Sequence, residues 1–462
     1  MAKNVHFSTF LAYFFMHVIL YCMIRNKGEI KVHFIGVGGA GMSVLAKTLI
    51  KKGFLVSGSD IKRSALVKEL EDLGLNFLGG HAKENVINSD VIVYSSAIKD
   101  DNVELAFAKR LNKAIYSRAE LLDLVLKSYK ISVGIAGSHG KTTATCMLAS
   151  ALDYLNLSTL SLMGGNSVTM GNFKFSRSNK SAISEICEFD KNLKRITVTY
   201  PVVLNVDSDH LDTYKTIDSL ADEFYAYLKR GKVAFINQDD ARLNSYKGKK
   251  VTFGINSNAD YTAKNVRLVD GKAIFSAYEK GRFLSEISLN VYGECNVYNA
   301  LSVIAVLRKV YKVKANLLSE AIKSFKGVKR RFEEASIIPN KKVIFDYCHH
   351  PTEIASTIKT SKKLFGEVLY VFEPHTYSRT KLLYNDFLKV FKGENVIIYK
   401  TYPAREKYVK LGSSKTLATD LNALHFSKIT ELKRYLESSS IKTVVIMGAG
   451  ELYDKLNKKK DR

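Results

Sequence analysis

A glycine-rich run in the middle of the chain has the residue types and spacing of a phosphate-binding loop. It follows an apolar stretch, precedes a segment with helical spacing of apolar residues, and reads Gly137-Ser138-His139-Gly140-Lys141-Thr142-Thr143. Glycines let backbone N–H groups face a polyphosphate, the lysine can reach its terminal phosphates, and the following hydroxyl can bind Mg²⁺. Ile135 stands where the full motif has its first glycine, which lowers the specificity of the signal. The run predicts a site for ATP and Mg²⁺.

Acidic side chains gather after two strand-like stretches that follow this loop. Glu185, Glu188 and Asp190 end or follow residues 182–186, and Asp207, Asp209, His210 and Asp212 follow residues 202–206. Magnesium needs oxygen ligands, and open parallel sheets place their sites at the carboxyl ends of strands. Taken singly, such residues are ordinary loop or helix-capping residues. Two acidic clusters after a phosphate-binding loop favour metal binding.

A second glycine turn lies near the front of the chain. Its residues are Gly36-Val37-Gly38-Gly39-Ala40-Gly41, and Asp60 stands 19 residues beyond Gly41, at the end of the next strand-like stretch. By local rules this is a dinucleotide fingerprint, so an NAD-dependent dehydrogenase is one interpretation. The pyrophosphate of a UDP compound would suit the same helix N-terminus. The ATP loop farther along favours the second interpretation, because a simple dehydrogenase has no use for ATP.

Three successive series of strands and helices must position these residues. The first has strand patterns at 30–35, 54–57, 91–94 and 114–116 and a helix at 119–127. The second has strands at 131–136, 182–186, 202–206 and 233–236, an antiparallel-looking stretch over 251–289 with a turn at Asp270-Gly271, and a helix at 296–310. The third has strands at 342–345, 368–372, 396–399 and 443–447.

This alternation predicts an α/β fold of three domains, because each series is large enough for its own core. We expect a Rossmann-like N-terminal domain at 28–125, a P-loop ATPase-like central domain at 126–331, and a Rossmann-like C-terminal domain at 332–462. No repeat with a period of 20 to 50 residues is detectable, which argues against a solenoid.

Composition sets the broad class of protein. With 46% hydrophobic and 25% charged residues in 462, the chain is expected to be globular. The net charge of +25 comes from lysines spread along the whole length, without the basic stripe and interleaved aromatics of a nucleic-acid groove. A solvated basic surface and attraction of phosphorylated ligands are the two interpretations. Five cysteines without C-x-x-C spacing indicate neither a zinc site nor a disulfide framework.

The first residues need a separate interpretation. Residues 5–24 are nearly all apolar and long enough to cross a bilayer, and Arg25 and Lys27 follow them. They are either an anchor that leaves the body of the chain in the cytoplasm or a mis-assigned start, with translation beginning at Met23. An exported enzyme is disfavoured because a small-residue cleavage site is missing. We favour the start at Met23 and a cytoplasmic protein without other membrane association.

Taken together, the motifs resemble the Mur ligase family. They occur in order from about residue 30 to 452 and read GVGGAGMS, GSD, GSHGKTT, NVDSDHLDTY, NVYNA, GVKRRFE, DYCHHPTE, EPHTYSRT, YPAREK and MGAGEL. The resemblance implies an ATP-dependent ligase that joins L-alanine to the carboxylate of UDP-N-acetylmuramate through an acyl phosphate, in peptidoglycan precursor synthesis. It implies ATP and Mg²⁺ as cofactors, no nucleic acid as partner, and a monomer or dimer.

The same resemblance implies roles for individual residues. The UDP-sugar is expected at Gly36, Gly38, Gly39, Gly41, Asp60, His81 and His350, and ATP at the loop Gly137 to Thr143 with Asn296, Asn299 and Asp346. Thr142, Glu185 and His210 are the expected metal ligands. Lys141, His349 and Arg379 are the expected catalytic residues, and His349 would position or deprotonate the incoming amine. Arg330 and Arg331 have a weaker claim, because paired arginines commonly lie on a solvated face.

Several positions depart from the family pattern. They are Cys187, Phe189, Cys295, Phe345, Cys348 and Thr376. Thr376 replaces an arginine whose planar group could orient a carboxylate or phosphate, so amino-acid preference and rate are in question there. These departures motivate a further alternative: a Mur-like protein that binds nucleotides with weakened catalysis.

Overall fold

The computed structural model describes residues 30–176, 178–188, 193–207, 214, 216–404 and 406–457. The apolar segment 5–24 and the predicted site residues Asp190 and His210 lie outside them. The chain divides into two compact units, residues 1–261 with 302–313 and residues 262–301 with 314–462. In the described part of the chain, no helix is long and apolar enough to cross a membrane.

The first sheet has five parallel strands in the order β3-β2-β1-β4-β5. Its strands are β1 (Lys31–Ile35), β2 (Leu55–Asp60), β3 (Asn76–Gly79), β4 (Val91–Tyr94) and β5 (Ala114–Ser117). The connections are α2 (Ala40–Lys51), α3 (Ala65–Asp72), the 3₁₀ turn η1 (Lys83–Val86), α4 (Val103–Arg110) and α5 (Arg118–Lys127). The order changes direction beside β1, which is where open α/β sheets place their ligands.

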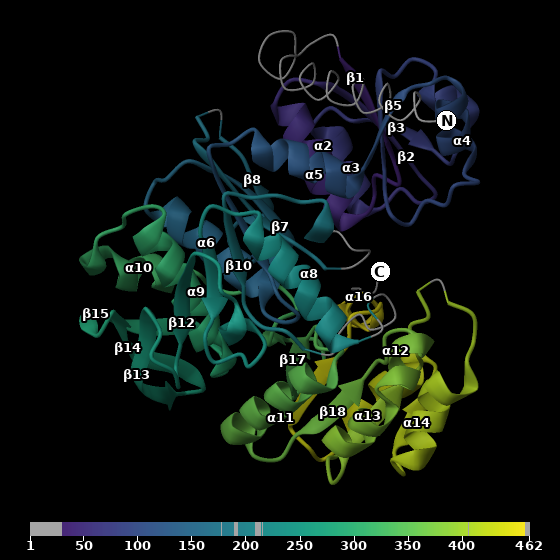
Figure 1. Ribbon diagram of the computed structural model, residues 1–462. Helices are drawn as coiled ribbons and strands as arrows, with labels where there is room; N and C mark the ends of the chain where they lie inside the picture. Colours follow the sequence, from purple (N-terminus) through teal and green to yellow (C-terminus); the bar gives the residue numbers. More distant parts are fainter. Residues whose placement is uncertain are drawn as a thin grey trace. The chain divides into compact units, whose positions relative to one another are not determined.

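Helices cover both faces of this sheet (Figure 1). Val32 and Phe34 of β1 pack with apolar residues of α2, α3 and α5. Ile35 and Ile92 pack on the other side with Val86 and with α4. Burial on both faces explains why β1 and β4 read as nearly continuous apolar runs.

Seven strands of the second sheet belong to the first unit, in the order β12-β11-β10-β6-β9-β7-β8. They are β6 (Ile131–Ala136), β7 (Thr159–Ser167), β8 (Gly171–Lys174), β9 (Ser181–Glu185), β10 (Tyr200–Val203), β11 (Ala234–Asn237) and β12 (Lys250–Gly254). All neighbours are parallel except the hairpin β7–β8. The helices α6 (Lys141–Tyr154) and α8 (Ile217–Lys229) connect them.

A buried lysine links the first two sheets. Lys47 of α2 is 2% exposed, and its ammonium donates to Glu69 Oε1 at 2.7 Å and to Asn172 Oδ1 of β8 at 3.2 Å. The helix α2 also packs against β7. A buried charge is tolerated only when it is paired and hydrogen-bonded, so the hairpin and α2 depend on each other.

The second unit begins with a β-hairpin and a helix. The strands β14 (Lys272–Glu279) and β15 (Arg282–Tyr292) are antiparallel, and α10 (Leu318–Lys323) packs against β15. Most of β13 (Tyr261–Val269) and the start of α9 (Cys295–Lys309) also belong to this unit. Asp270 and Gly271 both have positive φ, 47° and 72°, which confirms the predicted turn.

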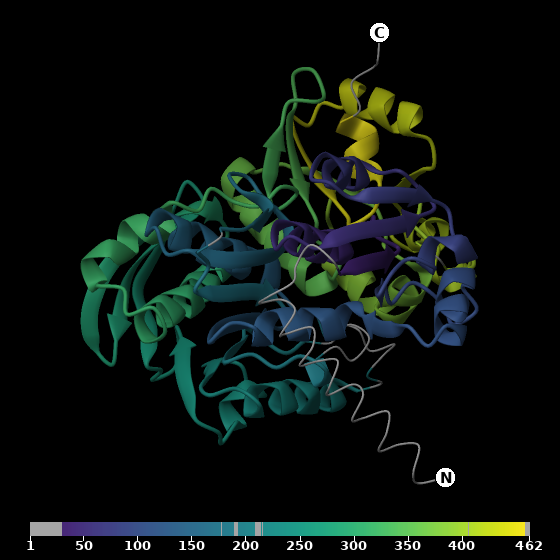
Figure 2. The same cartoon turned by 90° about the horizontal axis from the view of Figure 1, so that it is seen from above.

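The third sheet has the order β16-β17-β21-β18-β19-β20, and only β16 is antiparallel to its neighbour. Its strands are β16 (Glu333–Ala335), β17 (Lys342–Asp346), β18 (Leu369–Phe372), β19 (Val396–Tyr399), β20 (Leu424–Phe426) and β21 (Thr443–Met447). The helices α11 (Pro351–Phe365), α13 (Tyr384–Phe391) and α14 (Ser414–Asp420) cover one face. The helices α15 (Ile429–Ser438) and α16 (Leu452–Asn457) cover the other (Figure 2).

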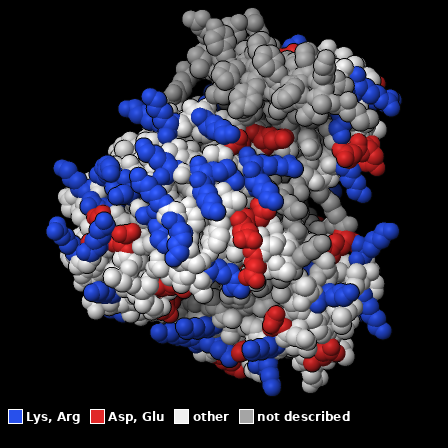
Figure 3. Space-filling view, viewed as in Figure 1, with Lys and Arg blue, Asp and Glu red and all other residues white. Residues whose placement is uncertain are grey.

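The α/β class and its three sheets agree with the prediction, and one detail was wrong. We predicted an antiparallel-looking stretch from residue 251, but β12 pairs with β11 in parallel, Val251 lying beside Phe235. The alternating pattern begins only with β13, because β12 is buried on both sides like the other central strands. The domain boundaries remain a prediction. Lysine and arginine side chains are spread over the face shown in Figure 3, as the sequence indicated.

Candidate functional site

The front glycine turn is held by hydrogen bonds to the last two residues of β2. Gly36 has φ +80°, and the N–H groups of Gly36 and Val37 donate to the Ser59 carbonyl oxygen at 2.9 and 3.0 Å. The Gly38 N–H donates to Asp60 Oδ2 at 2.9 Å, and a Cβ on Gly38 would lie 2.8 Å from the same oxygen. Asp60 therefore holds the turn in shape, and any contact with a ligand would be an addition to that role.

A polar cavity of about 470 Å³ lies close to this turn in the first unit. It is lined by Tyr94, Ser96, Ile98, Lys99, Asp100, Ser117, Arg118, Ala119 and Arg195. A Cβ on Gly41 would lie 3.1 Å from Arg118 Cδ, which places the cavity beside the glycine turn. Three cations and the N-terminus of α5 line it, while Asp100 is paired with Lys109 at 2.8 Å. The cavity suits an anionic ligand.

His81 follows the glycine pair at the end of β3. Its Nδ1 lies 2.7 Å from Oε2 of Glu104, a carboxylate that is completely buried. The side chain of His81 is 19% exposed. The expected ligand residue is thus held by a partner that sequence reasoning did not identify.

The phosphate-binding loop is fastened to the strand beside it. The Ser138 N–H donates to the Asn205 carbonyl oxygen at 3.1 Å, and the His139 N–H donates to Asn205 Oδ1 at 2.8 Å. The Asn205 amide donates back to the His139 carbonyl oxygen at 3.0 Å, and His139 Nε2 lies 2.8 Å from Asp207 Oδ2. Asn205, which we did not predict, therefore clamps the loop.

Lys141 is the first residue of α6, and its side chain folds back onto the phosphate-binding loop. Its ammonium donates to the carbonyl oxygens of Gly137 and Ser138 at 2.6 and 3.0 Å and to Glu188 Oε1 at 3.0 Å. Burial alone would lower the pKa of Lys141, but the nearby carboxylates, Glu188 first, outweigh it and raise the pKa. Lys141 is therefore a fixed positive charge at the helix N-terminus, as binding of a polyphosphate requires.

Thr142 and Glu185 form an oxygen pair that fits a magnesium ion. Thr142 Oγ1 donates to Glu185 Oε2 at 2.8 Å, and the Gly164 N–H donates to the same carboxylate oxygen at 3.1 Å. Hydroxyl and carboxylate oxygens are the donors that Mg²⁺ prefers. Thr143 lies in the first turn of α6 and is partly buried. The third expected ligand, His210, is outside the described residues, as are Asp209 and Asp212.

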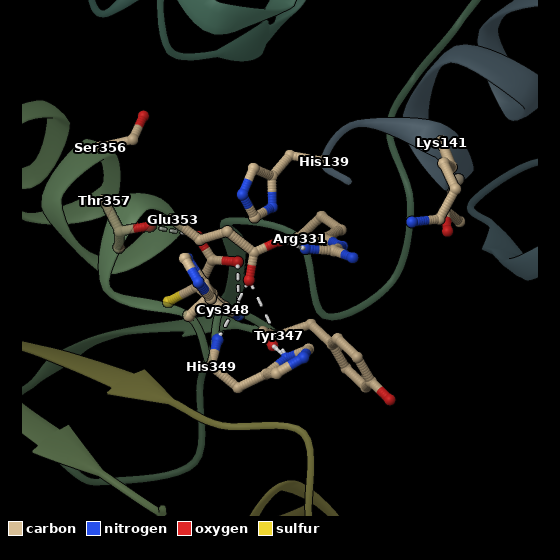
Figure 4. A network of polar contacts seen from close by, with 12 residues as sticks. His139, Lys141, Arg331, Tyr347, Cys348, His349, Glu353, Ser356 and Thr357 are labelled. Carbon is tan, nitrogen blue, oxygen red and sulfur yellow. Dashed lines mark hydrogen bonds and ion pairs between the residues drawn. The ribbon is translucent and has the colours of Figure 1, made fainter. Parts of the chain in front are cut away.

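In the second unit, a carboxylate network joins β17 to α11. Asp346 Oδ2 accepts from Thr357 Oγ1 at 2.7 Å, and burial raises the pKa of Asp346 to about 6 although the Arg331 guanidinium opposes the shift. Arg331 lies 3.5 Å from Glu353, and Glu353 accepts from the His349 N–H at 3.1 Å. Figure 4 shows Arg331, Glu353 and His349 directed toward one another.

His349 and Arg379 belong to one cluster through a residue that we did not assign. The His349 ring donates from Nδ1 to the Tyr347 carbonyl oxygen at 3.0 Å, and its centroid lies 5.6 Å from that of His375. His375 Nδ1 accepts from Arg379 Nη1 at 3.2 Å, and its ring stacks on Tyr402. His349 and Arg379, two of the three predicted catalytic residues, are therefore neighbours, with His375 between them.

The remaining expected residues have evident structural roles. His350 is the N-cap of α11 and accepts from the Thr352 N–H at 3.3 Å. Asn299 donates to Asn296 Oδ1 at 2.9 Å at the start of α9. Arg330 lies over the rings of Tyr347 and Tyr453 and donates to the carbonyl oxygens of Gly448 and Gly450. Ligand contacts of His350, Asn296 and Asn299 remain predictions, and Arg330 does not lie on a solvated face.

The turn after β18 contains the departure at Thr376. This residue has φ +67° and ψ 147°, a conformation that strains a β-branched residue. Its N–H donates to the Tyr402 carbonyl oxygen at 2.9 Å, and its hydroxyl caps α12 (Tyr377–Leu382) by accepting from the Arg379 N–H at 3.5 Å. Thr376 thus shapes the turn that carries Arg379.

Two protein-family models match the chain. The Mur ligase family catalytic domain covers residues 31–130, and the Mur ligase middle domain covers residues 135–307. The first match contains the front glycine turn. The second contains the phosphate-binding loop and all of α6.

Relatives of similar length extend the match to most of the chain. A UDP-N-acetylmuramate–L-alanine ligase from Caldanaerobacter subterraneus is 37% identical over 441 residues, 92% of this chain and 96% of the relative. One from Clostridium beijerinckii is also 37% identical, over 93% and 97% of the two chains. The crystal structure of UDP-N-acetylmuramate-alanine ligase MurC from Thermotoga maritima has a TM-score of 0.78 at 27% identity and covers 92% and 97%.

Proposed function

The chain belongs to the Mur ligase family, and from this membership we propose that it uses ATP to join L-alanine to the carboxylate of UDP-N-acetylmuramate in peptidoglycan precursor synthesis. The observation that carries the proposal is the loop in which Lys141 faces inward and Thr142 meets Glu185. The family match supports neither the dehydrogenase nor the weakened-protein alternative. Both stay useful as outcomes of the test.

The residues of the first unit would bind and activate the two nucleotides. The UDP-sugar would lie against the front glycine turn, with its anionic groups in the cavity that Lys99, Arg118 and Arg195 line. Lys141 would release Glu188 and neutralise the terminal phosphates of ATP, while Thr142 and Glu185 would hold Mg²⁺, which lowers the charge repulsion between phosphate and carboxylate.

The carboxylate oxygen of the sugar would attack the γ-phosphorus, the bond to ADP would break, and an acyl phosphate would form. The alanine amine would then attack the acyl carbon and expel inorganic phosphate. His349 is our candidate for holding or deprotonating that amine, and Arg379 for holding the amino-acid carboxylate or the phosphate through its planar guanidinium. Asn296, Asn299 and Asp346 are the proposed adenosine contacts.

Purified protein tests this directly. Inorganic phosphate should be released from ATP only when UDP-N-acetylmuramate and an amino acid are both present, with L-alanine the most effective of a panel. Phosphate release that is indifferent to the sugar nucleotide would remove the assignment. A change in nicotinamide absorbance would support the dehydrogenase, and ATP binding without product would support the weakened protein.

A further inference from the structure

The carboxylate of Glu104 is buried beneath the front glycine turn and has several donors. Glu104 lies in the first turn of α4 and is 0% exposed. Its Oε2 accepts from Ser59 Oγ at 2.7 Å and lies 2.7 Å from His81 Nδ1, while Oε1 accepts from Asn85 Nδ2 at 2.5 Å. A buried carboxylate persists only where such donors replace water.

The donors tie together the parts that shape the front site. Ser59 also offers the carbonyl oxygen on which Gly36 and Val37 rest. Asn85 also donates to the Gly80 carbonyl oxygen at 3.4 Å, in the loop that carries His81. Glu104 therefore fixes the His81 loop relative to the glycine turn.

The charge of Glu104 determines which ring nitrogen of His81 carries a proton. Burial would raise the pKa of Glu104, but hydrogen bonds from His33, Ser59, Asn85 and His81 outweigh it and hold the pKa at about 2. An ionised carboxylate only accepts, so His81 Nδ1 must carry a proton. When the ring carries a single proton, Nε2 is consequently an acceptor. Among the described residues, Nε2 has no hydrogen-bond partner.

We infer that Glu104 is a positioning residue that presents Nε2 of His81 as the acceptor for a donor group of the uridine, either the imide N–H of the base or a ribose hydroxyl. The inference rests on the proposed function, because that function supplies a uridine nucleotide to this domain. Glu104 itself would not touch the ligand.

The kinetic test uses Glu104→Gln in the full chain. An amide can donate as well as accept, so it no longer fixes the His81 proton on Nδ1. We expect the KM for UDP-N-acetylmuramate to rise about 10- to 100-fold, as when carboxylates that orient metal-bound histidines are changed. The KM for ATP and kcat at saturation should stay within about twofold. Glu71→Gln, which removes an exposed ion pair with Arg63 from the same domain, is the control and should leave all three constants unchanged.

An unchanged KM for the sugar nucleotide in folded Glu104→Gln would overturn the inference. A parallel loss of kcat and of affinity for both nucleotides would also overturn it, because that result indicates a purely structural role.

A spectroscopic test needs no variant of Glu104. In protein labelled with ¹⁵N-histidine, the His81 signal, assigned through His81→Asn, should show the tautomer with its proton on Nδ1. Added uridine, without phosphates, should shift the Nε2 resonance. A proton on Nε2, or a response to UDP but not to uridine, would overturn the inference. A protein that passes this test but forms no alanine product would contradict only the proposed function.

Discussion

The two glycine-rich turns of the first unit have the same place between a strand and a helix but different buried partners. Each follows a parallel strand, precedes a helix, and has a completely buried glutamate nearby: Glu104 at the front turn and Glu188 at the ATP loop. Glu104 is surrounded by hydroxyl, amide and imidazole groups, whereas Glu188 holds the ammonium of Lys141. On the proposed function, the turn provides an anion site in both cases, and we propose that the partner of the buried carboxylate distinguishes which part of a nucleotide is recognised.

The third sheet provides a contrasting turn. After β18, the position with positive φ is Thr376 rather than a glycine. Glycine adopts such a conformation at little cost, whereas threonine is strained in it. Strain of this kind is found where a turn must aim a functional side chain, and here the turn carries Arg379.

The largest effect is expected from Lys141→Ala, which removes the charge that distinguishes the ATP loop. The rate kcat should fall about 10²- to 10³-fold, the loss typical of removing one donor to a developing charge. Binding of UDP-N-acetylmuramate, measured by calorimetry, should be unchanged. Lys130→Ala is the control, since Lys130 is exposed. Equal loss of sugar-nucleotide binding would mean that the two turns are not independent.

The next effect concerns stability in acid. Because the pKa of Glu104 is lowered from 4.5 to about 2 in the folded protein, its contribution to stability is present above pH 4.5 and is lost as pH falls toward 2. The shift corresponds to about 3 kcal/mol. Urea unfolding should show that Glu104→Gln is less stable than the unaltered protein at neutral pH and that the difference shrinks with acid.

The contribution of Glu373, in the second unit, to the free energy of unfolding should change with pH in the opposite direction. Glu373 is also buried, and its carboxylate accepts from the Leu452 N–H at 3.1 Å, but burial outweighs this bond and raises the pKa of Glu373 to about 7. Its contribution is present below pH 4.5 and is lost as pH rises through 7. Glu373→Gln should therefore gain stability relative to the unaltered protein over that range. If the stability of Glu104→Gln and that of Glu373→Gln, each relative to the unaltered protein, changed with pH in the same direction, the number of hydrogen-bond donors would not explain why one carboxylate has a lowered pKa and the other a raised pKa.

A smaller effect is expected from Gly38→Ala. The added Cβ would lie 2.8 Å from Asp60 Oδ2, so the brace or the turn must move. The KM for UDP-N-acetylmuramate should rise about tenfold, the cost of losing one hydrogen bond of ordinary strength, and the KM for ATP should not change. Gly79→Ala is the matched control, because a Cβ there meets nothing within 4 Å. A change in the KM for ATP would argue against separate roles for the turns.

The smallest effect is expected from Thr376→Gly. Relief of backbone strain should raise the free energy of unfolding by about 1 kcal/mol. Loss of the threonine cap costs only a few tenths when glycine replaces it. Ser378→Gly, at an ordinary helical position, should instead destabilise the protein. Thermal unfolding of both variants distinguishes strain relief from a general effect of glycine.

The sequence predicted the strands well where an apolar run has glycine or polar residues on either side. The stretches at 131–136, 396–399 and 443–447 agree with β6, β19 and β21 to the residue. It misled at 251–254, because a short parallel strand next to an alternating hairpin has no pattern of its own. The neighbours of a strand in a sheet depend on contacts between residues that are distant in sequence, and local periodicity carries no information about these contacts.

The sequence predicted a glycine-rich loop between a strand and a helix, and the structure has this loop between β6 and α6, because the spacing of its glycine, lysine and threonine residues is local. Its ligands remain a prediction. Glu104, Asn205 and His375 were not identified. Each acts through a neighbour that is distant in sequence, such as Ser59 for Glu104 or His139 for Asn205. Asn205 had one usable signal, a lone amide directly after the strand beside the loop. A glutamate in the first turn of a helix is too common to stand out.

Lys47 limits how the chain can be divided for experiments. A fragment ending near residue 130 would keep α2 but lose β8, and with it Asn172 and the hairpin that shields the ammonium from water. The fragment would gain an exposed basic and apolar patch that intact protein lacks, and such patches promote association. Ligand screens and isotope labelling aimed at the UDP-sugar site should therefore use both sheets together.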